Sequence, residues 1–235
     1  MIKLIDILEN KILVPRRSKE ERQKNYLIST QKKIQQYIKD GSKGDLDLYN
    51  TPITSLPDNL QVGKNLNLAN TKIASLPNNL QVGGGLNLEN TPITSLPNSL
   101  KVGGDLYLHN TKITFLPNDL QVRGYLSLEN TPITSLPNNL QVGGYLSLYN
   151  TKITSLPDNL KVGGPLNLAN TLITSLPNDL KVGRGLDLEN TPITSLPNNL
   201  QVGGDLNLYN TLISQNHTKE EIRKMVPKVK GDIYI

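Results

Sequence analysis

The sequence predicts a solenoid of the α/β class, mostly β, in which short parallel strands stack along one axis. Two observations support this prediction. The pair Leu-Pro recurs eight times at an interval of 20 residues, from Leu56 to Leu196, and a fixed period of this length is the signature of a stacked repeat. Within each repeat, two leucines alternate with one variable residue, as in Leu86-Asn87-Leu88. Such period-two alternation is typical of a short strand.

Each repeat offers six apolar positions that we expect to face the core. Gly83-Gly84 before the strand and Asn90-Thr91 after it are turn sequences, and Pro77 excludes a long helix from the return segment. We therefore expect one strand per coil, at 46–48 and every 20 residues thereafter. In the repeat that begins at Leu76, the inward set is Leu76, Leu80, Val82, Leu86, Leu88 and Ile93.

A single coil is too small to fold alone, because ordering its backbone costs more than its six apolar side chains return on burial. Stacking adds hydrogen bonds and shared burial between coils. A threonine recurs at one turn position from Thr51 to Thr211. We expect its hydroxyl to bond the backbone of the next coil, which would give an internal polar ladder.

The pattern L-P-x(8)-L-x-L-x-x-T-x-I resembles the 20-residue, bacterial-type leucine-rich repeat over about residues 41–215. That family usually has Asn at the ladder position, where this chain has Thr, with Asn one residue earlier. The resemblance implies a right-handed, leucine-rich-repeat-like superhelix of short parallel strands. A right-handed parallel β-helix is the alternative architecture for coils of this kind.

Sequences at both ends predict caps. Ser18-Lys19-Glu20-Glu21 and Thr218-Lys219-Glu220-Glu221 are capping boxes, and the first predicts a helix that ends before Gly41. Residues 229–235 repeat the pattern of 202–208, which predicts a last strand that closes the solenoid. Residues 1–17 are expected to form a short amphipathic helix that docks on the cap or on a partner. We expect one continuous domain, made of a helical N-terminal cap (1–44), a solenoid of eight repeats (45–216) and a cap of helix plus strand (217–235).

Composition narrows the function. The chain has 235 residues and no Cys, which excludes disulfides, thiolate zinc sites and a cysteine nucleophile. Residues 1–44 hold 11 Lys and Arg against 5 Asp and Glu, whereas residues 45–216 hold 9 against 12. Because the body is mildly acidic, nucleic acid is not the expected partner. No apolar stretch is long enough to span a membrane, and the N-terminus lacks a signal-peptide core, so we expect an intracellular protein.

Variation among the repeats is concentrated at the outward positions of the strand, where tyrosines gather in three adjacent coils. Exposed tyrosine on a concave sheet is typical of recognition surfaces, although strands also favour aromatic residues for structural reasons. We expect these side chains to form one partner-binding patch on the concave sheet, rimmed by two glutamates. The candidate residues are Tyr107, His109, Tyr125, Tyr145 and Tyr149, with Glu89 and Glu129 at the rim.

The resulting hypothesis is a non-catalytic, monomeric module that binds a protein partner and takes no small-molecule substrate, cofactor or metal. The sequence holds no nucleophile–base set and no phosphate-binding glycine loop. Asp187, Glu189 and Asp205 are the weaker candidate for a calcium cluster, and the basic run from Arg16 to Lys33 is a weaker candidate for an acidic partner. The alternative function is a structural or spacer element that assembles through its caps.

Overall fold

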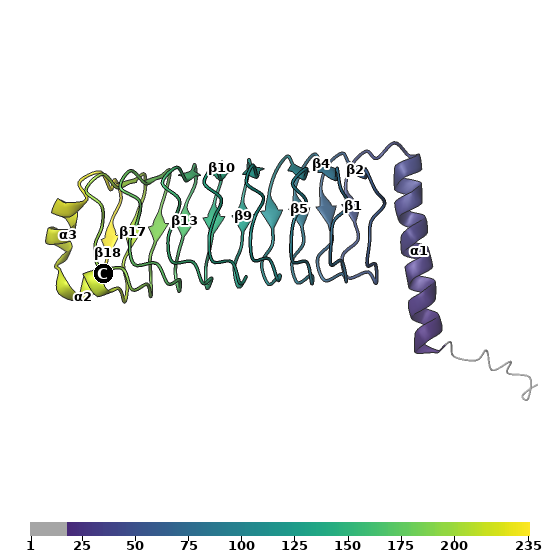
Figure 1. The fold of residues 1–235 in the computed structure, drawn as a ribbon, viewed down its shortest axis with the longest axis horizontal. Coiled ribbons are helices and arrows are strands. Elements are labelled where there is room, and N and C mark those ends of the chain that lie inside the picture. Colours follow the sequence, from purple (N-terminus) through teal and green to yellow (C-terminus); the bar gives the residue numbers. More distant parts are fainter. Residues whose placement is uncertain (1–17) are drawn as a thin grey trace, which may run out of the picture.

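The computed structural model describes residues 18–235, which form an elongated rod of stacked coils with a cap at each end (Figure 1). Helix α1 (Lys19–Lys39) lies across one end, and α2 (Leu212–Asn216) and α3 (Lys219–Met225) cover the other. The expectation for residues 1–17 lies outside the described residues. None of the described helices is long and apolar enough to cross a membrane.

The main sheet confirms the predicted strands. It is parallel, and each leucine pairs with its equivalent in the next coil, as Leu66 does with Leu86. Its ten strands, in spatial order, are β1 (Leu46–Asp47), β3 (Leu66–Asn67), β5 (Leu86–Asn87), β7 (Leu106–Tyr107), β9 (Leu126–Ser127), β11 (Leu146–Ser147), β13 (Leu166–Asn167), β15 (Leu186–Asp187), β17 (Leu206–Asn207) and β18 (Ile233–Tyr234). We call the outward side of this sheet the ten-strand face.

Each coil also contains a second short strand, where an irregular return segment is predicted from the sequence. Its first residue points outward and its second, Val, points into the core. These strands form two separate sheets. One contains β2 (Gln61–Val62), β4 (Gln81–Val82) and β6 (Lys101–Val102), and the other contains β8 (Gln121–Val122), β10 (Gln141–Val142), β12 (Lys161–Val162), β14 (Lys181–Val182) and β16 (Gln201–Val202).

The second set of strands is interrupted between β6 and β8, beside Arg123. In six other coils glycine follows the Val, and its N–H donates to the Val carbonyl of the preceding coil, as Gly103 does to Val82 at 2.8 Å. A Cβ on Gly103 would overlap the backbone carbonyl of Gly83. Arg123 brings such a Cβ, and within residues 18–235 the corresponding bond to Val102 is missing. The break therefore coincides with the one second strand of the eight repeats that is followed by a residue other than glycine, although in the C-terminal cap Lys230, which also has a Cβ, donates to Val202 at 2.9 Å.

The predicted core is confirmed, because all six apolar positions are buried in each of the eight repeats. The predicted threonine ladder between coils is wrong. Thr91 is buried, but its hydroxyl donates to the carbonyl of Leu88 in its own coil at 2.6 Å. The bonds between coils come instead from the asparagine one residue earlier, where Asn90 Nδ2 donates to Asn70 Oδ1 at 3.1 Å. Asn90 has φ of 55°, a left-handed conformation that asparagine tolerates better than most residues.

Both predicted capping boxes are present. Ser18 caps α1 and Thr218 caps α3, each with a reciprocal bond to the glutamate three residues later. The predicted last strand is β18, whose Ile233 pairs with Leu206, and Val229 forms a parallel bridge with Val202. Helix α2 was not predicted from the sequence. The C-terminal cap thus continues both strand layers, whereas α1 lies across the first coil.

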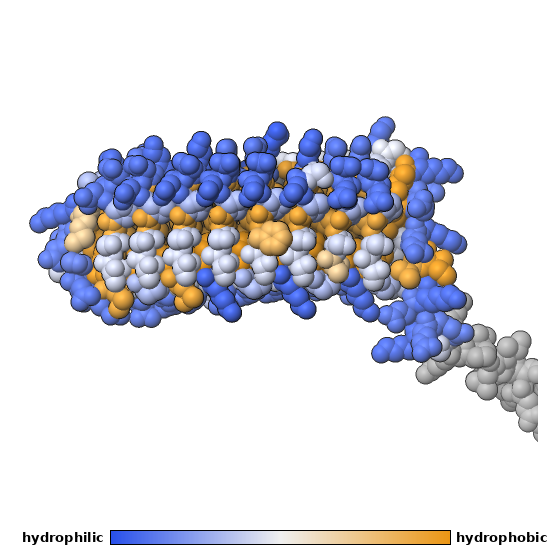
Figure 2. All heavy atoms as spheres, viewed as in Figure 1, coloured by the Kyte–Doolittle hydropathy of each residue, from blue (hydrophilic) through white to orange (hydrophobic). Residues whose placement is uncertain are grey.

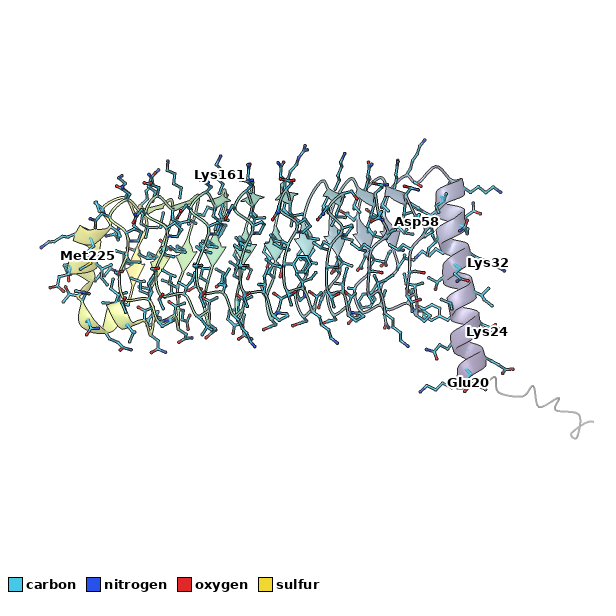
Figure 3. All side chains as sticks on the ribbon, in the orientation of Figure 1. Glu20, Lys24, Lys32, Asp58, Lys161 and Met225 are labelled. Atoms are coloured by element: carbon cyan, nitrogen blue, oxygen red, sulfur yellow. The ribbon has the colours of Figure 1, made fainter. Side chains whose placement is uncertain are left out.

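One long side of the rod combines a hydrophobic band with a polar edge. Figure 2 shows one side, on which a hydrophobic band runs beside rows of hydrophilic side chains that line one edge. Figure 3 places Lys161 of β12 at that edge, with Lys24 and Lys32 on α1 at one end of the rod and Met225 in α3 at the other. The second set of strands contributes the outward Gln or Lys of each coil to this polar edge.

Candidate partner-binding site

The ten-strand face is built on a side-chain bond that recurs along the rod. In six coils the mid-strand residue is Asp or Asn, and its Oδ1 accepts from the backbone N–H two residues later. Asn167 accepts from Ala169 N at 2.8 Å in this way. The bond satisfies an amide that the strand pairing leaves open. The mid-strand Asp and Asn residues are therefore structural, which the sequence alone did not indicate.

Three adjacent coils lack this mid-strand bond. Their mid-strand residues are Tyr107, Ser127 and Ser147, in consecutive strands β7, β9 and β11. Both serines are inaccessible, at 1% and 0% exposure, although this position is half-exposed in most other coils. No hydrogen bond of ordinary geometry reaches either serine Oγ, although the Ser127 hydroxyl is near enough to the Tyr125 hydroxyl to lower its pKa. Buried unpaired hydroxyls cost free energy and are uncommon in folded proteins.

The tyrosines of the same coils form a row across the strands. The ring centroids of Tyr107 and Tyr125 lie 5.2 Å apart with an interplanar angle of 51°, and those of Tyr125 and Tyr145 lie 4.9 Å apart at 44°. These are favourable tilted packings. We call Tyr107, Tyr125 and Tyr145 the tyrosine row. The rings are half-buried rather than fully exposed as expected, and they flank the two inaccessible serines.

Two of the tyrosine hydroxyls donate hydrogen bonds to carboxylates. Tyr107 Oη donates to Asp105 Oδ2 at 3.1 Å, and Tyr125 Oη donates to Glu129 Oε1 at 3.1 Å. Burial raises the pKa of Tyr125 to about 12; the Ser127 hydroxyl opposes this increase, and the negative charge of Glu129 adds to it. Burial, and then Asp105, likewise raises the pKa of Tyr107. Both hydroxyls are therefore neutral hydrogen-bond donors at physiological pH.

The structure brings only part of the predicted patch together. His109 Nε2 lies 3.0 Å from Glu89 Oε1, so the histidine pairs with one of its two neighbouring glutamates. Tyr149 is more exposed than the tyrosine row, at 39%, and none of the ring pairs includes it. Phe115, the only Phe of the sequence, is 56% exposed. Ser127 and Ser147 are the residues that sequence reasoning missed, because serine at an outward position carries no signal of burial.

A groove of about 320 Å³ adjoins the tyrosine row on the ten-strand face. Its lining comes from the coils that follow Tyr145 and from the last strand. Across residues 18–235, no cluster of three or more His, Cys, Asp or Glu side chains is placed to hold a metal ion. Two of the three candidate calcium ligands, Asp187 and Asp205, line the groove. In the structure they accept hydrogen bonds from Asn207 Nδ2 and Asp232 N, respectively.

No family model matches the chain, and no curated protein matches it. Among solved structures, the leucine-rich repeat domain of a Shigella effector is similar, with 20% identity over 92% of this chain and 93% of that chain, at a TM-score of 0.49. A leucine-rich repeat protein of Leptospira interrogans is 22% identical over 77% of this chain and 76% of that chain, at a TM-score of 0.25. The register of the 20-residue coils and their buried leucines identify the fold as a leucine-rich-repeat-like parallel β solenoid.

Proposed function

We propose that this chain is a non-catalytic recognition module that binds a protein partner through the tyrosine row. The observation that carries the proposal is the loss of the structural Asp or Asn in the three coils that bear the row. A position that breaks a local structural rule in an otherwise regular protein is a candidate functional site.

The chemistry of the row suits a protein surface. Tilted tyrosines give a large, rigid contact area with little loss of conformational entropy on binding. The unpaired Oγ atoms of Ser127 and Ser147 can pair with polar groups of a partner once the neighbouring rings move. Glu89 and Glu129 are half-exposed beside the row, which favours a partner with hydrogen-bond donors or positive charge at the rim.

Site-specific photo-crosslinking in the organism that encodes the chain tests this proposal. A benzophenone amino acid at position 125 should capture a protein, whereas the same group at Thr134, exposed on the return side of the same coil, should not. With the captured protein purified, Tyr125→Ala and Tyr145→Ala should each weaken its binding by about 2 kcal/mol, as expected of interface hot spots.

Charge reversal on the N-terminal cap separates recognition from a spacer role. Lys24 and Lys32 project from α1 (Figure 3), far from the tyrosine row along the rod. The double variant Lys24→Glu/Lys32→Glu should leave binding of the captured protein unchanged. If it abolishes binding while the tyrosine variants bind normally, the chain acts through its ends and the recognition proposal is wrong.

A further inference from the structure

The groove beside the tyrosine row exists because two coils lack a large side chain at the position before the strand. Tyr125 and Tyr145 occupy this position in two coils, and the next two coils carry Pro165 and Gly185. Tyr145 forms one wall of the groove, and Tyr209 and Tyr234 line it from the other side. Its volume of about 320 Å³ is at the lower end for ligand pockets, so it suits one long side chain.

The lining of the groove is negatively charged. Asp187 is a lining residue, and Asn207 Nδ2 donates both to Asp187 Oδ1 at 3.0 Å and to Glu189 Oε2 at 3.4 Å. One amide nitrogen therefore serves two carboxylates. Asp205 lies in the next coil and also lines the groove. The lining residues include no Lys, Arg or His.

These carboxylates lack a cationic partner within the described part of the chain, where the only ion pairs are those of His109 and His217. Burial, and to a smaller degree the charge of Glu189, raises the pKa of Asp187. The ionised form of Asp187 is thus destabilised by burial and by repulsion from Glu189. A bound cation would offset both the burial and the repulsion.

We propose that this groove binds the guanidinium group of an arginine side chain presented by the protein partner. A guanidinium group stacks on aromatic faces and pairs with carboxylates through a planar fork of donors. The tyrosine walls and Asp187 supply both kinds of contact. The proposal rests on the proposed function for the origin of the arginine, but the groove can be tested without the partner.

Saturation-transfer NMR on the full chain tests the groove directly, because it detects weak ligands through the ligand's own signals. The probe is the peptide acetyl-Gly-Arg-Gly-amide. Two counterparts carry citrulline, which has a similar shape without the charge, or lysine, which has the charge without the fork. We expect the strongest transfer at the arginine side chain and markedly weaker transfer to either counterpart.

Two variants with matched controls locate the site. Asp187→Asn should weaken arginine binding by about tenfold, because a charge-assisted bond becomes a neutral one. Asp47→Asn is its control, since Asp47 makes the same mid-strand bond in the first coil. Gly185→Tyr should fill the groove and abolish binding. Gly85→Tyr is its control, because Gly85 holds the same position five coils earlier, where Asn87 replaces Asp187.

Equal transfer to the citrulline peptide, or unchanged binding in Asp187→Asn, would overturn the proposal. Equal transfer to the lysine peptide would overturn the assignment to guanidinium. The proposed function fails separately, through the crosslinking at position 125. If Tyr125→Ala weakens binding of the captured protein while the arginine peptide does not bind, the proposed role of the tyrosine row is supported and the proposed role of the groove is wrong.

Discussion

The two strand layers of the rod differ in continuity. The ten-stranded sheet runs from β1 to β18 without a gap, although the residue before its strand is Asp, Asn, Gly, Tyr or Pro in different coils. The second layer has nearly constant sequence and yet divides into sheets of three and five strands. Variation is frequent in the layer that stays intact, and a single change accompanies the break in the other.

The difference lies in the space around Cβ. A Cβ on Gly185, before a strand of the continuous sheet, would meet only the carbonyl oxygen of Asp205 at 3.5 Å, which is an ordinary contact. A Cβ on Gly183, two residues earlier at the corner of the second layer, would overlap the carbonyl of Gly163. Larger side chains therefore fit before the strands of the continuous sheet but not at the glycine corner of the second layer. The location of the tyrosine row follows from what the coil geometry permits.

Removal of the C-terminal cap should have the largest effect, because both layers end on it. Residues 217–235 supply β18 and the bridge at Val229. Their four buried aliphatic side chains, Ile222, Val226, Val229 and Ile233, correspond to about 6–12 kcal/mol of hydrophobic burial. This is comparable to the whole stability of a typical domain. We expect aggregation or loss of a cooperative melt, measured by sedimentation and calorimetry.

Deletion of one internal coil, residues 141–160, is the control for the cap deletion. It removes a similar length and keeps both caps and the register of 20 residues. This variant should remain monomeric and melt cooperatively. A cap deletion that stays monomeric with an unchanged melting temperature would show that the capping argument is wrong.

The substitution Gly183→Ala should destabilise the chain by about 1–3 kcal/mol, the usual cost of overpacking. Its matched control is Gly185→Ala, which should leave the free energy of unfolding unchanged or raise it slightly, since alanine restricts the unfolded chain. Urea titration measures both. Equal destabilisation by the two variants would contradict the account based on Cβ clearance.

Replacement of Ser147 by Asn should restore the mid-strand bond on the continuous sheet. We expect a gain of about 0.5–1.5 kcal/mol in the free energy of unfolding, the net worth of one hydrogen bond, together with weaker binding of the crosslinked partner. The reverse change, Asn167→Ser, should lose a similar amount, because Asn167 makes that bond now. A lower free energy of unfolding in Ser147→Asn would contradict the view that Ser147 is kept for function.

The smallest expected effect comes from Arg123→Gly, which should join the two short sheets of the second layer. The bond regained is offset by the entropy of a new glycine, so the free energy of unfolding should change by less than about 1 kcal/mol. Hydrogen exchange is the sensitive measurement. The amide at position 123 should exchange more slowly than in the parent chain, and an unchanged rate would disprove the role of the Arg123 side chain in the break.

Much of the fold could be predicted from the sequence, because repetition makes local signals unambiguous. Leu66 and Leu86 pair as their spacing implies, and Ser18 and Thr218 start helices where their capping boxes indicate. The second strand was missed because Gln81-Val82 is only two residues long and no alternation can be read from it. The direction of the Thr91 hydroxyl was missed because spacing alone does not distinguish its own coil from the next.

The candidate site was harder to predict than the fold. Tyrosines in adjacent coils indicated a patch, and three of them do pack together. The sequence could not show that Ser127 and Ser147 are buried and unpaired, since burial depends on how the neighbouring rings tilt. The groove is also invisible in the sequence, because Pro165 and Gly185 create it through the absence of larger side chains.

The identical register between neighbouring coils has a consequence for folding kinetics. Strand pairs between neighbouring repeats span only 20 residues, as between Leu146 and Leu166. Contacts of such short separation favour rapid nucleation at many points along the chain. The same regularity makes a skipped coil nearly degenerate with the correct pairing, because the residues that meet are of the same types. The entropic cost of closing the loop that an expelled coil would form is small. Off-pathway species of this kind are characteristic of repeat proteins. We expect them to persist after the initial collapse of this chain, until the unique sequences of its two caps select the correct alignment.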